Sequence, residues 1–131
     1  MLARPRPARI PNDGGGRKCY LSVMTSKFTL ADLEQRVSDR ANAPAEQSYT
    51  RQLLDKGVSQ CAKKFGEEAV EVVLAVVGED REHVIAESAD VLYHLFVMLQ
   101  ARGVKLAEIE ALLEIRTKKS GLEEKASRPR E

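Results

Sequence analysis

Apolar residues return every three or four positions along the chain from Thr29 onward, and no segment shows the strict alternation of a half-buried strand. This period predicts helices throughout and therefore an all-α fold. Thr29 is suited to cap the first helix, and Asn42 to Pro44 end it. A short second helix is predicted to begin at Ser48 and to stop near Gly57.

Three further helices are predicted downstream. The third spans about residues 59–77, and a turn at residues 78–80 leads into a fourth over about residues 81–102. Gly103 ends the fourth helix, and a fifth follows over about residues 105–118. The third helix carries an apolar stripe formed by Phe65, Ala69, Val72, Val73 and Val76. Short connections make neighbouring helices antiparallel, so we expect an antiparallel bundle of about four to five helices.

The second half of the fourth helix is apolar almost all round, from Val91 to Leu99. A helix tolerates this composition only when it is covered on every side, and one small chain offers little cover. Assembly of the protein as a homodimer is the simplest explanation. Packing of this helix inside a larger bundle is the alternative.

The N-terminal segment has a different composition, with several prolines, a run of three glycines from Gly14 and scattered arginines. Such a segment cannot bury enough apolar surface to order itself. Met24 stands directly before the first regular pattern, so too early a start codon is another explanation. We therefore interpret residues 1–26 as a disordered or mis-annotated extension, and residues 27–131 as one all-α domain with a basic C-terminal tail.

The whole-chain charge is nearly balanced, with 21 Lys and Arg against 20 Asp and Glu and a net charge of +1. This balance gives no argument for a nucleic-acid or membrane partner. Cys19 and Cys61 have neither metal-type nor redox-type spacing, which fits a reducing cytoplasm, and Cys61 is expected in the core near Phe65. The most apolar stretch, Val91 to Leu99, contains His94 and is shorter than the roughly 18 to 20 residues of a membrane span.

Acidic residues recur at matched spacings on the third and fourth helices. Glu68 and Glu71 are three positions apart, Glu67 is four before Glu71, and Glu87 and Asp90 repeat the three-residue spacing. At about 100° per residue, the acids of each helix share one stripe, and a tight turn lets the two stripes face each other. Because apolar positions flank both stripes, the carboxylates would be poorly solvated and would need a cation.

Oxygen ligands without a nearby Cys or His pair favour a hard ion, so we expect Mg²⁺, with Mn²⁺ as a substitute. The predicted metal ligands are Glu67, Glu68, Glu71, Glu87 and Asp90. The alternative is a solvated acidic face paired with Lys63, Lys64 or Arg102. His94, one turn after Asp90, could support a ligand or act as a general base, although a buried histidine satisfied by a neighbour is more common.

Residues 66–71 (Gly-Glu-Glu-Ala-Val-Glu) and 87–90 (Glu-Ser-Ala-Asp) carry a resemblance to a known signature. Together they resemble the EExxE…ExxD pattern of the all-α nucleotide pyrophosphohydrolases, the MazG-like superfamily. Within it the chain is more similar to the phosphoribosyl-ATP pyrophosphatase family. This closer similarity comes from residues 48–57, 63–68, 89–95, 116 and 120–125. The resemblance covers roughly residues 27–128, and the family usually lacks the N-terminal extension.

The resemblance implies hydrolysis of phosphoribosyl-ATP between its α and β phosphates, which gives phosphoribosyl-AMP and pyrophosphate in the second step of histidine biosynthesis. It makes Glu67, Glu68 and Glu71 the expected catalytic residues, with Glu67 either holding a further ion or accepting a proton from the attacking water. The expected substrate and phosphate contacts are Ser48, Tyr49, Lys63, Lys64, Arg116, Lys118, Lys119 and Lys125.

Plainer interpretations stay open for these residues and for the activity. Ser48 could only cap a helix, and the basic C-terminal residues could form a solvated tail. A house-cleaning nucleoside triphosphate pyrophosphatase would keep the same fold and metal. A non-catalytic helical interaction module is a different class, for which Mg²⁺ should neither bind nor stabilise the fold.

Overall fold

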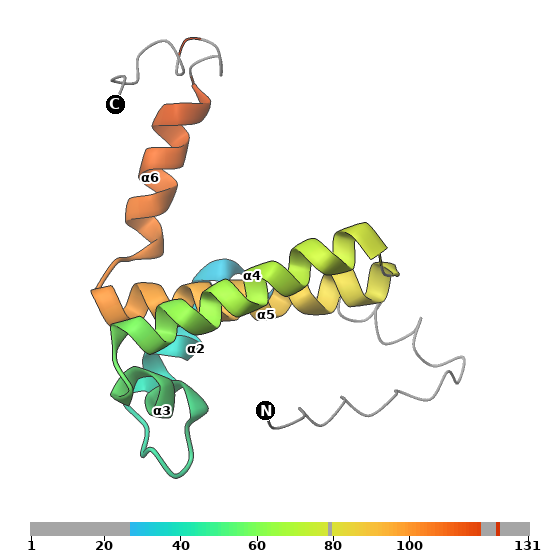
Figure 1. Cartoon of the computed structure of the whole chain (residues 1–131). Coiled ribbons are helices and arrows are strands. Elements are labelled where there is room, and N and C mark those ends of the chain that lie inside the picture. Colours follow the sequence, from blue (N-terminus) through green and yellow to red (C-terminus); the bar gives the residue numbers. More distant parts are fainter. Residues whose placement is uncertain (1–26, 79, 119–122, 124–131) are drawn as a thin grey trace.

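The computed structural model describes residues 27–78, 80–118 and 123. Within these residues the chain is helical and contains no strand (Figure 1). The helices are α2 (Leu30–Ala41), α3 (Tyr49–Asp55), α4 (Val58–Gly78), α5 (Arg81–Arg102) and α6 (Leu106–Thr117). The all-α prediction is confirmed, and every predicted helix is present close to its expected bounds. The predicted extension at residues 1–26 lies outside the described residues.

The ends of the helices follow from local side-chain chemistry. The Thr29 hydroxyl accepts a hydrogen bond from the Asp32 backbone N–H, and the Asp32 carboxylate accepts one from Thr29, which is a complete capping box. Asp80 caps α5 by accepting from the His83 backbone N–H at 3.0 Å. Gly103 ends α5 with φ of 66°, a left-handed conformation that costs glycine least.

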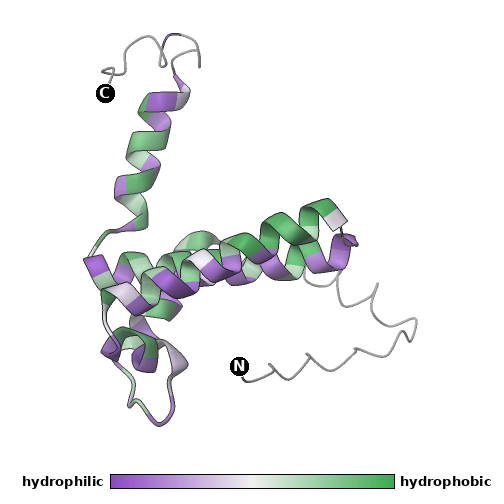
Figure 2. Ribbon diagram, viewed as in Figure 1, coloured by the Kyte–Doolittle hydropathy of each residue, from purple (hydrophilic) through white to green (hydrophobic). Residues whose placement is uncertain are grey.

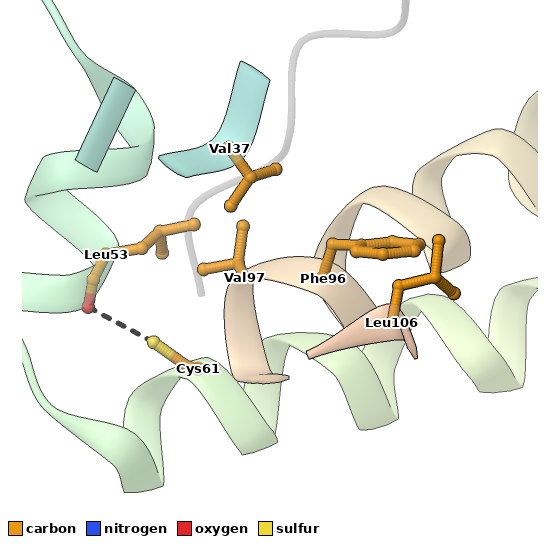
Figure 3. Close-up of a cluster of buried hydrophobic side chains, with 6 residues drawn as sticks. All are labelled: Val37, Leu53, Cys61, Phe96, Val97 and Leu106. Atoms are coloured by element: carbon orange, nitrogen blue, oxygen red, sulfur yellow. Dashed lines mark hydrogen bonds between the residues drawn. The ribbon is translucent and has the colours of Figure 1, made fainter. Parts of the chain in front are cut away.

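The hydrophobic core lies where α2, α3, α5 and the start of α6 meet the first turns of α4 (Figure 3). Its buried members are Val37, Leu53, Cys61, Phe96, Val97 and Leu106. The Cys61 thiol donates a hydrogen bond to the Leu53 carbonyl oxygen at 3.4 Å, and burial raises the pKa of this thiol. The prediction that Cys61 belongs to the core is therefore confirmed.

Helices α4 and α5 form a long antiparallel pair, and α5 also contacts α2 and α3 (Figure 1). In contrast, the backbone of α6 comes close only to that of α2 among the described helices, and beyond Leu106 this helix leads away from the α4–α5 pair. The first turn of α6 is anchored from a distance, because the Leu106 backbone N–H donates to the Glu34 carboxylate at 2.8 Å. A core at one end of the long pair and a projecting α6 are the two main features of this architecture.

Apolar residues occur in the C-terminal half of α4 and along α6 (Figure 2). Several of their side chains are exposed. The predicted stripe of α4 is only partly covered, since Val73 and Val76 are 61% and 63% exposed. The sequence pattern predicted the stripe but not its exposure, which arises because this half of the α4–α5 pair extends beyond α2 and α3. We call Val70, Val73, Leu74, Val76 and Val77 the apolar end of α4. On α6, the exposed apolar residues are Leu112, Leu113 and Ile115.

The apolar segment of α5 is largely covered within one chain. His94, Phe96 and Val97 are buried, and the other residues from Val91 to Leu99 are half-buried. By length and average composition alone, α5 is long and apolar enough to cross a membrane. Its continuous apolar run, from Val91 to Leu99, is too short to indicate this. Core helices of soluble proteins can have the same length and composition, and α5 carries Glu87 and Asp90 and packs against three other helices.

Candidate metal centre

Three carboxylates converge between α4 and α5. Glu68 and Glu71 lie one turn apart on α4, and Glu87 lies on the antiparallel α5. One carboxylate oxygen from each lies within 4.8 Å of the others. The pairing of the two helices, which sequence spacing alone could only suggest, brings these residues to one place.

Burial makes this group electrostatically costly without a cation. Glu68 is only 6% exposed, and Glu71 and Glu87 are half-buried. Burial and then the nearby charges of Glu71 and Asp90 raise the pKa of Glu87 above its usual value. A carboxyl group that resists ionisation beside other carboxylates is the state that a bound cation would relieve.

The donor set fits a small divalent ion. The three ligand atoms are carboxylate oxygens, which hard ions such as Mg²⁺ and Mn²⁺ prefer, and no cysteine or histidine belongs to this group among the described residues. Mg²⁺ usually keeps several waters and takes further oxygens from phosphates, so three protein ligands leave room for a substrate. The residues therefore fit the predicted metal.

The other two predicted ligands lie outside the group of three. Glu67 is half-buried, and its Oε2 accepts a hydrogen bond from Lys64 Nζ at 3.1 Å. Asp90 is exposed, although its charge acts on both Glu87 and His94. Three of the five predicted ligands thus come together within 4.8 Å, and the roles of Glu67 and Asp90 stay predictions. A step of about 100° per residue separates the direction of Glu67 from that of Glu68.

Lys64 is held by the acids of its own helix. Its Nζ lies 3.1 Å from Glu67 Oε2 and 3.1 Å from Glu68 Oε1. Burial by itself lowers the pKa of Lys64, but the hydrogen bonds and charges of Glu67 and Glu68 outweigh it and leave the pKa above its usual value. The ion pairs with Lys64 that the alternative named are therefore present, whereas the neighbouring Lys63 is exposed.

The start of α3 contributes one structural and one accessible side chain. The Ser48 hydroxyl donates to the Arg40 carbonyl oxygen at 2.7 Å and accepts from the Arg51 backbone N–H at 3.1 Å, so it serves as a cap. Tyr49 is 53% exposed, and its ring packs edge-on to His94 with 6.4 Å between centroids. Tyr49 therefore borders the acidic group, while Ser48 supports the helix.

The two described basic residues that were predicted as contacts at the C-terminal end do not approach the acidic group within one chain. Arg116 and Lys118 are exposed at the far end of the projecting α6, and Lys118 pairs with Glu114 at 2.8 Å. The helix pattern fixed their position on α6 but not the direction in which α6 runs. Lys119 and Lys125 lie outside the described residues.

Two contacts that sequence reasoning missed support this region. The Thr50 and Tyr93 hydroxyls lie 2.6 Å apart, although 43 positions separate them in the chain. His94 lies beside Tyr93 and is buried, with Nε2 4.0 Å from Glu68 Oε1. No local spacing reveals the hydroxyl pair, since the packing of α3 against α5 creates it.

The helical fold and the facing carboxylates define an all-α pyrophosphohydrolase of the MazG-like class. More narrowly, the chain belongs to the phosphoribosyl-ATP pyrophosphohydrolase family, whose model matches residues 30–117. A phosphoribosyl-ATP pyrophosphatase of Bradyrhizobium diazoefficiens is 63% identical over 102 residues, which are 78% of this chain and 96% of the relative. A second, from Rhodopseudomonas palustris, is 60% identical over 81% of this chain and 99% of its own length. A third, from Azorhizobium caulinodans, is 62% identical over 79% of this chain and 95% of its own length.

Proposed function

We propose that the chain hydrolyses phosphoribosyl-ATP to phosphoribosyl-AMP and pyrophosphate, the reaction for which its family is named. It is a hydrolase of phosphoanhydride bonds and acts in histidine biosynthesis. The observation that carries this proposal is the convergence of Glu68, Glu71 and Glu87 within 4.8 Å in a chain that matches the family over residues 30–117. We assign the activity to residues 27–131 as one domain.

We assign different roles to the acidic residues according to where they lie. Glu68, Glu71 and Glu87 would hold the divalent ion between α4 and α5, and Asp90 would extend this site from one turn further along α5. Mg²⁺, when bound, supplies positive charge that neutralises phosphate oxygens and helps an attacking water to lose its proton. Glu67 lies beside the group and is the member to which we assign acceptance of that proton.

Several other side chains border the place where the substrate would lie. Lys63 is exposed one turn before the acids and can approach phosphate oxygens, as can Lys64 if its ion pairs rearrange. The exposed ring of Tyr49 offers an aromatic face to a base or sugar. Ser48 contributes by fixing the first turn of α3 from which Tyr49 projects.

We further propose that the protein is a homodimer in the cytoplasm. The exposed apolar end of α4 and the apolar residues of α6 support an assembly, since large apolar patches mark interaction surfaces. Because α6 leads away from the acids of its own chain, Arg116 and Lys118 would reach a substrate only at the site of another copy. The buried thiol of Cys61, with no disulfide, fits a reducing compartment.

The direct test is release of pyrophosphate from phosphoribosyl-ATP by the purified chain with Mg²⁺, with ATP at the same concentration as the matched substrate. We expect rapid release from phosphoribosyl-ATP and little from ATP. Equal or faster turnover of ATP would indicate a general nucleoside triphosphate pyrophosphatase. No release from either substrate would contradict the proposed activity.

A further inference from the structure

His94 lies buried between two aromatic rings beside the acidic group. It is 7% exposed, and its ring packs edge-on against Tyr93, with 5.0 Å between centroids, and against Tyr49. Tyr93 is itself fixed by the hydrogen bond between its hydroxyl and that of Thr50 at 2.6 Å. Packing therefore sets the direction in which the imidazole points.

That direction places Nε2 at the metal group. Nε2 lies 4.0 Å from Oε1 of Glu68, the most buried of the three converging carboxylates. Lys64 Nζ contacts the same oxygen at 3.1 Å. The Oε1 side of Glu68 thus lies between a lysine and a histidine, while the carboxylate as a whole belongs to the group shared with Glu71 and Glu87.

The other ring nitrogen, Nδ1, indicates that filling the pocket is not the only role of His94. Nδ1 of His94 is buried and has no hydrogen-bond partner in the described part of the chain. A buried polar atom without a partner is unfavourable, and an apolar side chain of similar size would fill the pocket without it.

We propose that His94 is a positioning residue for Glu68: its Nε2–H and Lys64 fix Oε1, so that the carboxylate faces the ion shared with Glu71 and Glu87. This inference rests on the proposed metal-dependent function. The separation of 4.0 Å is longer than a hydrogen bond, and a small rotation of Glu68 closes it. Partners that orient metal ligands typically change metal affinity by about 10-fold to 100-fold when they are removed.

A matched pair of substitutions tests the role of Nε2. In His94→Gln the amide nitrogen occupies the position of Nε2 and can donate to Glu68, whereas His94→Met has nearly the same shape without a donor. Binding of Mn²⁺ is measured by calorimetry without substrate, and thermal unfolding is followed in parallel. We expect His94→Met to weaken Mn²⁺ binding at least about 10-fold with an unchanged or higher Tm, and His94→Gln to stay within about threefold of the original chain.

Other outcomes would overturn the proposal. Equal Mn²⁺ affinity in His94→Met and the original chain would show that Glu68 needs no help from His94. Equal losses in the Gln and Met variants, with both folded, would show that the donor at Nε2 is not the cause. The original chain is also assayed for release of pyrophosphate from phosphoribosyl-ATP. A chain that binds Mn²⁺ in a His94-dependent way but releases no pyrophosphate would contradict the proposed function and leave this inference intact.

Discussion

The two halves of α4 place opposite kinds of side chain in unusual surroundings. In the first half, Glu68 is 6% exposed and shares its surroundings with two more carboxylates. In the second half, Val77 is 82% exposed and Val73 is 61% exposed. A typical helix of an isolated soluble protein buries its valines and exposes its glutamates.

Both departures indicate something that a single chain does not supply. Buried carboxylates need a cation, because their mutual repulsion and loss of solvation are unfavourable. Exposed valines need an apolar partner surface, because water is excluded from them only by contact. Under the proposals made above, α4 would take part in two binding events, with an ion at its charged half and a second copy of the chain at its apolar half.

The largest expected effect is the loss of activity caused by a substitution in the charged half of α4. Replacing Glu71 by Gln removes a metal ligand and should lower pyrophosphate release about 1000-fold or more, which corresponds to about 4 kcal/mol of transition-state stabilisation. The variant should stay folded, because the substitution also relieves like-charge repulsion. Steady-state kinetics and circular dichroism measure the two properties. Glu110→Gln, an exposed change on α6, is the matched control, and full activity in Glu71→Gln would contradict the metal assignment.

Metal binding at the charged half of α4 should stabilise the folded chain. Mg²⁺ at 100 times its Kd adds about 2.7 kcal/mol to the free energy of unfolding if it binds only the folded chain. Thermal unfolding in Mg²⁺ and in EDTA, at matched ionic strength, measures the shift in Tm. The shift should disappear in Glu71→Gln. A Tm that does not respond to Mg²⁺ would favour a non-catalytic interaction module.

A charge introduced into the apolar half of α4 should disrupt the proposed dimer. Val73→Asp removes an apolar contact from each copy of the proposed dimer, worth about 1.5 kcal/mol or more per side chain, and adds a desolvated charge. Light scattering at micromolar concentration should show dimers for the original chain and monomers for the variant. Ser59→Asp, an exposed change in the first half of α4, should leave the dimer intact. A monomeric original chain would refute the dimer.

The smallest expected effect is on the pH dependence of stability, and it comes from Asp80 in the turn after α4. The hydrogen bond from the His83 backbone N–H, and then that with its side chain, lower the pKa of Asp80 in the folded chain. A lowered carboxyl pKa contributes stability above the unfolded value, which is lost as pH falls through the folded value. Urea unfolding between neutral pH and pH 3 should show this loss in the original chain. Asp80→Asn should show a weaker dependence, and identical profiles would contradict the assignment.

Local chemistry was enough to predict the helices. Thr29, Ser48 and Asp80 cap because their side-chain oxygens reach backbone N–H groups two or three residues onward, and Gly103 ends α5 through its own backbone. The three-residue spacing also placed Glu68 with Glu71 on one stripe. Each of these features depends on neighbours within one helical turn, which the sequence displays directly.

Contacts between helices were beyond such reasoning. The Thr50 and Tyr93 hydroxyls, 43 positions apart in the chain, lie 2.6 Å from each other because α3 packs against α5. The dimer contact was predicted around Val91 to Leu99, whose residues are buried or half-buried in one chain, and the sequence did not reveal that the end of α4 is exposed. Both outcomes depend on where α2 and α3 pack along the α4–α5 pair, and periodicity carries no information about that position.

The sequence by itself thus determined an all-α chain, its helix boundaries, its family and the set of acids from which a metal site can be built. Only the tertiary structure decided that Glu68, Glu71 and Glu87 converge, that His94 faces Glu68, and that α6 carries Arg116 and Lys118 away from the acids of its own chain. The physical reason is the range of the forces involved. Helix formation and capping are settled within a few residues, whereas convergence of side chains depends on the relative position of whole helices and on the burial that this packing creates.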